Sequence, residues 1–382
     1  MIPKPSPEEQ KRVFDLIWSQ MPHMQNRMSS SWWFFILFPK GEEGYGPKQM
    51  MFSTSNRVGD TVSISGTQLP GIDLKRAVKD GVDQFDAISV GWYCDGKEVY
   101  EDLVKQTAVA TLSSDGFIRA WAKQSNGEQH GGEIRASATD PLTLEAHFKG
   151  LNGEARFSTW GDRDKLDTSP HESINIDTPL GGTHFIAWRL VNFKGEFTTP
   201  AGTEQLEGLG YFQRVCLNVP TFPWKWIWAL FEDGTLFSSY VPYIGANLLR
   251  RGYKFFDKKW LEQRTISVAP AAYIDFHGHS HRLDFDTARI TPILGKGPHP
   301  DFAVYAKFKN GDFISYRAEC YGHARQYIDR PILNGKASTH WNYNEYMFQT
   351  RDLSGRIGNK VINAKTMGNG FGSLEYTWGL GL

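Results

Sequence analysis

The chain has few cysteines and no excess of charge of either sign. Its 382 residues include 3 cysteines, Cys94, Cys216 and Cys320, which lie far apart and form no Cys-x-x-Cys or zinc-type spacing. A disulfide framework is therefore excluded, and a reduced, cytoplasmic protein is predicted. Lysine plus arginine and aspartate plus glutamate number 42 each. Because the formal net charge is zero, no nucleic-acid partner is predicted.

Long apolar runs and familiar catalytic signatures are also missing. The longest early apolar run spans residues 32–38, far short of the roughly 20 residues that cross a membrane, so no integral membrane segment is predicted. The sequence has no Walker loop, no Gly-x-Ser-x-Gly and no His-Glu-x-x-His. "GNGFGS" at 368–373 imitates part of a dinucleotide fingerprint, but strand-like residues follow it. We interpret this segment as a β turn and predict no cofactor.

Aromatic residues and turn dipeptides are abundant. Aromatics make up 14% of the chain, with 13 Trp, 15 Tyr and 25 Phe, and these residues suit both β surfaces and pockets for apolar ligands. Asp-Gly or Asn-Gly pairs, which close β-hairpins, occur at 95–96, 115–116, 126–127, 152–153, 233–234, 310–311, 334–335 and 369–370. The pattern predicts an all-β, mostly antiparallel fold.

Helical signals are few. Ser6 as N-cap, Pro7 at the first position and apolar residues at helical spacing predict a short N-terminal helix. Small helical insertions are predicted at 71–85 and 244–263. The polar segment 192–208, rich in Gly, Thr and Pro, is the predicted domain boundary. The predicted parts are a helix and leader (1–28) and two β-barrel domains (29–200 and 201–382).

The stretch "TFPWKWIWALFEDG" at 221–234 places Trp224, Trp226 and Trp228 at alternate positions, so a strand would present all three on one face. Nearby strands contribute polar groups at Tyr211, Gln213, Arg214 and Tyr240. Aromatic walls with a few polar groups are typical of a ligand pocket. In "SSSWWFFILF" both faces of the strand are apolar, as expected of a barrel strand with a packed outside or of a buried sandwich strand.

A string of histidines, "DFHGHSHRLDFD", offers a possible metal site. His277, His279 and His281 alternate, with Asp275 in phase, and two such imidazoles on a strand can bind zinc or iron. Consecutive same-face positions lie nearly 7 Å apart, which fits a tetrahedral ion poorly for three ligands. We therefore predict no metal and prefer a polar, partly exposed strand face, or one histidine in a pocket, as the interpretation.

Two further groups of polar residues have open interpretations. Glu345 is in phase with Trp341 and Tyr343, and it could point into the second barrel or lie on an exposed face. His184 and Trp188 share a face and could line the first barrel or pack its core.

Four short segments together resemble the lipocalin-like carotenoid hydratase (hydroxyneurosporene synthase) family, whose superfamily also contains pericyclases and cyclases. They are the early "WWFF" strand, the "GLGY" strand, the "WKWIW…DG" hairpin that follows it, and the terminal "GNGFGSLEYTWG". The resemblance covers roughly residues 30–382. It implies two lipocalin-like antiparallel β-barrels that hold a hydrophobic isoprenoid or polyene-like molecule between or inside them, without a cofactor.

Hydratases of this kind need an acid to protonate an alkene, aromatic faces for the cation, and a placed water. The resemblance implies ligand-binding roles for Trp32, Trp33, Trp224, Trp226, Trp228 and Trp341. The acid maps poorly, because Phe212, Gln213 and Arg214 follow "GLGY" where hydratases tend to carry His or Asp. The catalytic candidates are therefore hydrogen-bond donors or a weak acid: Tyr211, Gln213, Arg214, Tyr240 and His279.

The sequence thus leaves several functions open. The first is a cofactor-free hydratase, cyclase or isomerase, and the alternative is a non-catalytic carrier of a lipophilic ligand. A buried ionisable group with a shifted pKa beside the tryptophans would favour the enzyme, and a uniformly apolar cavity would favour the carrier. A metal-dependent enzyme and a carbohydrate-processing β-sandwich are weaker hypotheses. The carbohydrate hypothesis is weak because we find no pair of carboxylates in phase with the Trp strand. The oligomeric state is not predicted.

Overall fold

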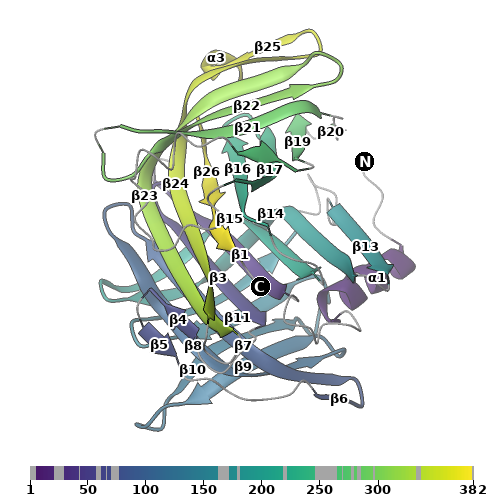
Figure 1. Ribbon diagram of the computed structural model, residues 1–382, viewed down its shortest axis with the longest axis vertical. Helices are drawn as coiled ribbons and strands as arrows, with labels where there is room; N and C mark the ends of the chain where they lie inside the picture. Colours follow the sequence, from purple (N-terminus) through teal and green to yellow (C-terminus); the bar gives the residue numbers. More distant parts are fainter. Residues whose placement is uncertain are drawn as a thin grey trace.

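The chain folds into two antiparallel β-sheets, with a short helix at one end of the first sheet (Figure 1). The computed structural model describes residues 6–20, 30–42, 44–56, 62–65, 67–69, 77–161, 172–178, 181–217, 222–245, 265–268, 270–276, 279–281, 285–295, 297–332 and 337–380. All statements below concern these residues. The all-β prediction is confirmed.

The first sheet closes into a ten-stranded antiparallel barrel, because β12 pairs with both β11 and β14. Its strands are β1 (Ser30–Gly41), β3 (Gln49–Asn56), β7 (Val82–Cys94), β8 (Val99–Ser113), β9 (Phe117–Lys123), β10 (Gln129–Ala136), β11 (Leu144–Lys149), β12 (Glu154–Trp160), β14 (Gly181–Thr199) and β15 (Gly202–Leu217). Shorter strands at its margins are β2 (Gly44–Tyr45), β6 (Ala77–Lys79) and β13 (Glu172–Thr178). Phenylalanines from seven of the barrel strands pack inside it, so side chains fill the interior.

The helix α1 (Pro7–Ile17) packs against β14 at one end of the barrel. Its start follows the predicted signals: the Ser6 hydroxyl accepts a hydrogen bond from the Glu9 amide at 3.1 Å, and proline occupies the first turn. Val13, Leu16 and Ile17 are buried against the barrel core. The predicted N-terminal helix is thus confirmed.

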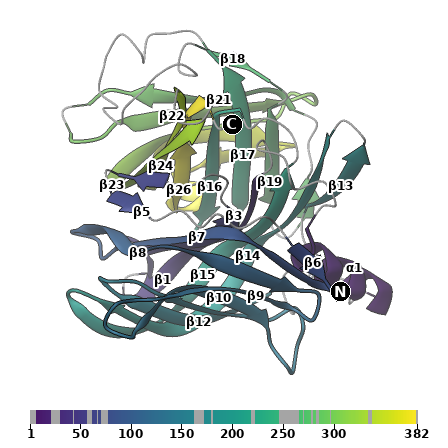
Figure 2. The same ribbon diagram turned by 60° about the horizontal axis from the view of Figure 1, so that its bottom comes forward.

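The second sheet lies over the barrel wall, and its two longest strands run down beside that wall (Figures 1 and 2). Its main strands are β16 (Trp224–Phe231), β17 (Leu236–Ile244), β19 (Ala271–Phe276), β20 (His279–His281), β21 (Phe285–Ile293), β22 (Asp301–Phe308), β23 (Phe313–Ile332), β24 (Ala337–Ile357) and β26 (Gly370–Tyr376). Its smaller elements are β4 (Val62–Ile64), β5 (Thr67–Leu69), β18 (Ile266–Ser267), β25 (Lys360–Asn363), α3 (Ala364–Met367) and β27 (Trp378–Leu380). The hairpin from β16 to β17 turns at Asp233-Gly234, where Gly234 has φ of +85°.

Strands at the contact between the two sheets are apolar on both faces. In β1, Trp33 and Phe35 point into the barrel core, whereas Phe34 and Ile36 belong to a separate cluster between the sheets. In β16, Trp226 joins that intersheet cluster, and Ile227 on the opposite face packs in the core of the second sheet. The two-faced apolar pattern of "WWFFILF" therefore reflects a barrel strand with a packed outside.

Two features differ from the sequence-based expectations. The predicted boundary at 192–208 lies within the β14–β15 hairpin, and β15 pairs with β1, so the first sheet continues to Leu217 and the main strands of the second sheet begin at Trp224. The division into two domains itself stays a prediction. The helical insertion expected at 71–85 is wrong for 77–85, where β6 and the start of β7 pair as a hairpin; residues 71–76 and 246–264 lie outside the described part of the chain.

Candidate functional site

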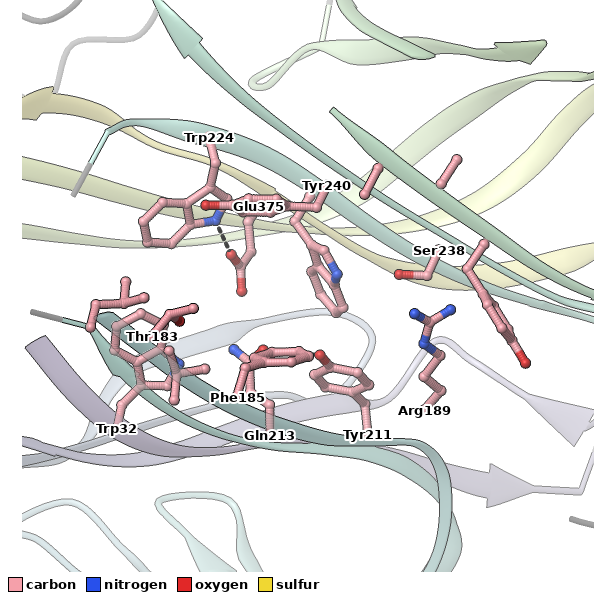
Figure 3. Close-up of a pocket in the computed structure, with 16 residues that line it drawn as sticks. Trp32, Thr183, Phe185, Arg189, Tyr211, Gln213, Trp224, Ser238, Tyr240 and Glu375 are labelled. Carbon is pink, nitrogen blue, oxygen red and sulfur yellow. Dashed lines mark hydrogen bonds between the residues drawn. The ribbon is translucent and has the colours of Figure 1, made fainter. Parts of the chain in front are cut away.

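A pocket of about 280 Å³ lies between the outer wall of the barrel and the second sheet (Figure 3). Its floor comes from β1, β14 and β15, and its roof comes from β16, β17, β19 and β26. The volume is near the lower end of the roughly 300–1,000 Å³ typical of small-molecule sites. The pocket therefore suits a compact molecule or one end of a longer one.

Aromatic rings form much of the pocket wall. Trp32 on the floor and Trp224 on the roof are stacked, with ring centroids 6.4 Å apart and planes inclined by 14°. Trp226 lies 5.0 Å from Tyr211, centroid to centroid, and Tyr240 lies 6.3 Å from Trp224. These π faces can stabilise a cation inside the pocket.

The roof also carries a carboxyl group, that of Glu375 on β26. In the strand register Glu375 lies opposite Trp226 of β16, so both side chains face the pocket from neighbouring strands. The Trp224 indole N–H donates a hydrogen bond to its Oε2 (Figure 3). Burial raises the pKa of Glu375 to about 7, despite hydrogen bonds from Trp224 and Tyr343 that favour the ionised form. A large fraction of this carboxyl is therefore protonated at neutral pH.

A second carboxyl group, that of Glu345 on β24, lies behind Glu375. The two glutamates are directly opposite each other in the β24–β26 register. The Tyr343 hydroxyl lies within hydrogen-bonding distance of both, 2.8 Å from Glu375 Oε1 and in contact with Glu345 Oε2. Burial, followed by the charge of Glu375, raises the pKa of Glu345 well above its ordinary value. The earlier alternatives for Glu345 are thus resolved: it is fully buried.

The floor of the pocket carries further polar groups, which lie farther along the pocket than Glu375. The Tyr211 hydroxyl donates to Gln213 Oε1 at 2.9 Å. Farther along, the Arg189 guanidinium lies 3.5 Å from the centroid of the Tyr273 ring, and both residues line the pocket (Figure 3). Burial raises the pKa of Tyr211, with opposing effects from Arg189 and Glu375. Tyr211 therefore lies between a positive charge and an acid.

Several predicted site residues meet in this pocket, and others do not. Tyr211, Gln213, Tyr240, Trp32, Trp224 and Trp226 all line it. Trp341 does not line it but lies behind Trp224, with ring centroids 5.1 Å apart. Trp228 is fully buried, stacked on Phe38 at 4.8 Å, and donates its indole N–H to the Arg189 carbonyl at 2.6 Å. Of the three in-phase tryptophans, two form the pocket wall and the third packs the intersheet core.

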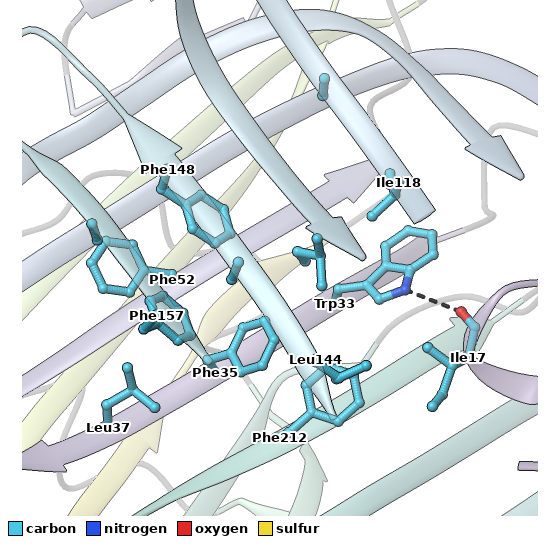
Figure 4. Packing of buried hydrophobic residues seen from close by; sticks show 14 of the residues in the cluster. Ile17, Trp33, Phe35, Leu37, Phe52, Ile118, Leu144, Phe148, Phe157 and Phe212 are labelled. Atoms are coloured by element: carbon cyan, nitrogen blue, oxygen red, sulfur yellow. Dashed lines mark hydrogen bonds between the residues drawn. The ribbon is translucent and has the colours of Figure 1, made fainter. Parts of the chain in front are cut away.

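Trp33 lies on the other side of the barrel wall (Figure 4), and the buried Arg214 packs against it there. The Trp33 indole donates to the Ile17 carbonyl at 3.1 Å, and the Arg214 guanidinium lies 3.6 Å from the Trp33 ring centroid. Arg214 also donates to the carbonyls of Ile17 and Ser19. Both residues therefore join the end of α1 to the barrel. Arg214 is one residue out of phase with the pocket-facing Tyr211 and Gln213.

His184 and Trp188 pack on this inner side of the barrel as well. Burial, reinforced by the nearby Arg214, lowers the pKa of His184 to about 4. His184 is thus a neutral residue of the structural interior at physiological pH.

The histidine string contributes no described side-chain contact. His277 lies outside the described residues, and His279 and His281 are placed on β20 by their backbone only. Within the described ranges, no group of His, Cys, Asp and Glu side chains is arranged to hold a metal ion. A catalytic role for His279 stays a prediction.

Sequence reasoning missed Glu375, although it lies in "GSLEYTWG". It also found no carboxylate pair in phase with the Trp strand, which is wrong, because Glu345 and Glu375 come from strands far along the chain. The missing signal is strand pairing: alternation in "NYNEY" and "SLEY" puts both glutamates on defined faces, but only the register brings those faces together. Glu345 does not line the pocket, so the pair does not flank a bound substrate.

Comparison with known proteins gives matches to solved structures at low identity. No known family profile matches the chain, and no curated protein matches its sequence. A candidate AttH protein from Nitrosomonas europaea superposes with a TM-score of 0.44 and 10% identity, over 94% of this chain and 97% of the other. Kievitone hydratase from Nectria haematococca gives a TM-score of 0.42 and 13% identity, over 95% of this chain and 93% of the other.

In the described part of the chain, no helix is long and apolar enough to cross a membrane.

Proposed function

We propose that this protein is a cofactor-independent hydratase-type enzyme that adds water to an alkene of an apolar, oxygen-bearing isoprenoid molecule. The observation that carries the proposal is Glu375, a buried carboxyl with a pKa raised to about 7 in the wall of an aromatic pocket. Such an acid keeps its proton near neutral pH and is poised for general acid catalysis.

The chemistry begins with proton transfer from the Glu375 carboxyl to one alkene carbon, which leaves a carbocation at the other. The faces of Trp32, Trp224 and Trp226 stabilise this cation by about 2 kcal/mol or more in a desolvated site. A water molecule forms the new C–O bond, and the proton it loses returns to the Glu375 carboxylate. The net result is one H and one OH added across the double bond, with the enzyme unchanged.

The polar floor supports binding of an oxygen function. The Arg189 guanidinium and the Gln213 amide N–H groups can donate to a carbonyl, phenol or alcohol oxygen of the substrate while its alkene lies beneath Glu375, and Tyr211 holds the Gln213 amide oxygen. The volume of about 280 Å³ limits the enclosed part to a compact group. A longer polyene would extend through the pocket mouth.

The same acid can start two related reactions. Cyclisation follows if a second double bond captures the cation, and isomerisation follows if a neighbouring proton is lost. A non-catalytic carrier remains the alternative proposal. A buried acid pair is unfavourable in a simple carrier because burial of ionisable groups costs free energy without assisting apolar binding.

The test is incubation of the purified protein with a panel of isoprenoid alkenes that carry phenol, ketone or alcohol groups, in water labelled with ¹⁸O. We expect a product with one labelled oxygen from the wild type and from Glu207→Gln, a matched control at an exposed position. Glu375→Gln should bind the same compounds, as judged by tryptophan fluorescence, and form no product. Binding without product in the wild type would support the carrier, and product formation by Glu375→Gln would exclude Glu375 as the acid.

A further inference from the structure

We propose that Glu345, Tyr343 and Glu375 form a proton relay in which Glu345 stores a proton and passes it to Glu375 through the Tyr343 hydroxyl. This inference rests on the proposed function, because it assigns the supply of the proton that Glu375 delivers. It concerns two residues behind the pocket that do not line it.

The geometry of the three groups requires a shared proton. The Tyr343 oxygen contacts one oxygen of each carboxyl, Glu345 Oε2 and Glu375 Oε1. A tyrosine hydroxyl has one proton to donate, so it can donate to only one of the two carboxyls. The other contact is a hydrogen bond only when that carboxyl is itself protonated and donates to the tyrosine oxygen. At least one of the two glutamates therefore carries a proton in this arrangement.

The outer oxygens of the pair have partners of their own. The Trp224 indole, which can only donate, occupies Glu375 Oε2. The Ser373 hydroxyl donates to Glu345 Oε1 and accepts from Gln49 Nε2 at 2.6 Å. These contacts leave the two inner oxygens, on either side of Tyr343, as the positions for the mobile proton.

Both placements of that proton satisfy every hydrogen bond. In one, Glu345 is protonated and donates to the Tyr343 oxygen, while the Tyr343 hydroxyl donates to the Glu375 carboxylate. In the other, Glu375 is protonated and donates to Tyr343, which donates to the Glu345 carboxylate. Two short proton movements in the same direction interconvert them. One proton leaves Glu345, one arrives at Glu375, and Tyr343 stays neutral throughout.

With one proton shared between the two glutamates, one carboxyl is neutral and the other carries the negative charge. The ionisable side chains near the pair include tyrosines from three strands, Tyr343 on β24, Tyr240 on β17 and Tyr211 on β15, and the Arg189 guanidinium lines the same pocket as Glu375. Burial raises the pKa of all three, so they remain protonated near neutral pH. Both glutamates are buried and Tyr343 is partly buried, but Glu375 reaches the pocket whereas Glu345 does not, so Glu375 is the carboxyl that exchanges a proton with solvent and Glu345 the one that retains it.

The relay lets the enzyme keep a protonated acid at pH values above the pKa of Glu375 itself. Once Glu375 has lost its own proton to solvent, the proton held at Glu345 can still reach it. Activity should therefore persist at a plateau above about pH 7, and decline only when the second proton of the pair is lost.

A first test needs no substrate and follows the glutamate side-chain carboxyl carbons by ¹³C NMR during a pH titration. We expect two resonances in the wild type that titrate above all other glutamates, and one in either Glu345→Gln or Glu375→Gln. Tyr343→Phe should raise both apparent pKa values, because its hydroxyl stabilises the ionised forms. Tyr316→Phe, a matched change at a fully buried tyrosine in the other core, should leave them unmoved. Titration of both glutamates near 4.5, or indifference to Tyr343→Phe, would overturn the relay.

A second test measures the pH dependence of turnover once a substrate is found. Glu345→Gln and Tyr343→Phe should each lose the alkaline plateau and decline about tenfold per pH unit, as expected for a single acid. Near pH 6 the loss of activity in both variants should be smaller than at pH 8. A plateau that survives in either variant would overturn the relay. The NMR result stands even if no alkene is hydrated, so failure of the relay and failure of the proposed function are distinguishable.

Discussion

The free energy of unfolding of Glu375→Gln, measured relative to that of the wild type, should be higher at pH 8 than at pH 5. Burial raises the pKa of Glu375 from an ordinary value of 4.5 to about 7 in the folded state. Between these pH values the folded state binds a proton that the unfolded state has released. The free energy of unfolding of the wild type therefore falls as pH rises through this window.

The magnitude follows from the two pKa values. Their difference of about 2.5 corresponds to about 3 kcal/mol of stability lost between pH 4.5 and pH 7. Glutamine cannot ionise, and its amide can accept from Trp224 and donate to Tyr343 in the same positions. For a chain of 382 residues, about 3 kcal/mol corresponds to a change in Tm of about 4 °C.

The assay is thermal and urea unfolding of both proteins at pH 5 and pH 8, followed by circular dichroism. We expect the gap between Glu375→Gln and the wild type to move by about 3 kcal/mol in favour of the variant at the higher pH. The exposed control Glu207→Gln removes the same charge and should show almost no such movement. An equal gap at both pH values would refute a raised pKa for Glu375.

Two other substitutions test the assignment of residues to opposite sides of the barrel wall. Trp226→Ala should weaken binding of a hydrophobic fluorescence probe at least tenfold, because the substitution removes a wall of the pocket. If titration of the protein with such probes leaves its tryptophan fluorescence unchanged, the pocket is contradicted. Arg214→Ala should lower the free energy of unfolding by about 3 kcal/mol, since it removes a buried group that holds the end of α1, and should leave probe affinity within about twofold. Weaker probe binding with unchanged stability would place Arg214 in the site instead.

Much of the fold could be predicted from local sequence. The Ser6-Pro7 start fixes a helix because its signals lie within one turn. The Asp233-Gly234 pair predicts its hairpin because only the turn conformation matters there. The boundary at 192–208 was harder to place, since a polar turn at the end of a long barrel hairpin has the same composition as a linker.

The candidate site was predictable only in part. Alternation placed Trp224 and Trp226 on one face of a strand, and that face does line the pocket. Alternation could not distinguish Trp228, because its stacking on Phe38 of the other sheet, outside the pocket, depends on how the two sheets pack. Glu375 could not be recognised as an acid from sequence, since its pKa depends on burial between sheets and on contacts with Trp224 and Tyr343.

The pocket draws its floor and its roof from opposite sides of a single junction in the chain. The floor residues end at Leu217 and the roof residues begin at Trp224, so in the proposed function the groups that would bind the substrate oxygen and the acid that would deliver the proton are encoded on separate stretches of the gene. A recombination event between residues 217 and 224 would join a new floor to an unchanged acid. Descendants of this fold could thereby acquire new substrates while keeping the same chemistry.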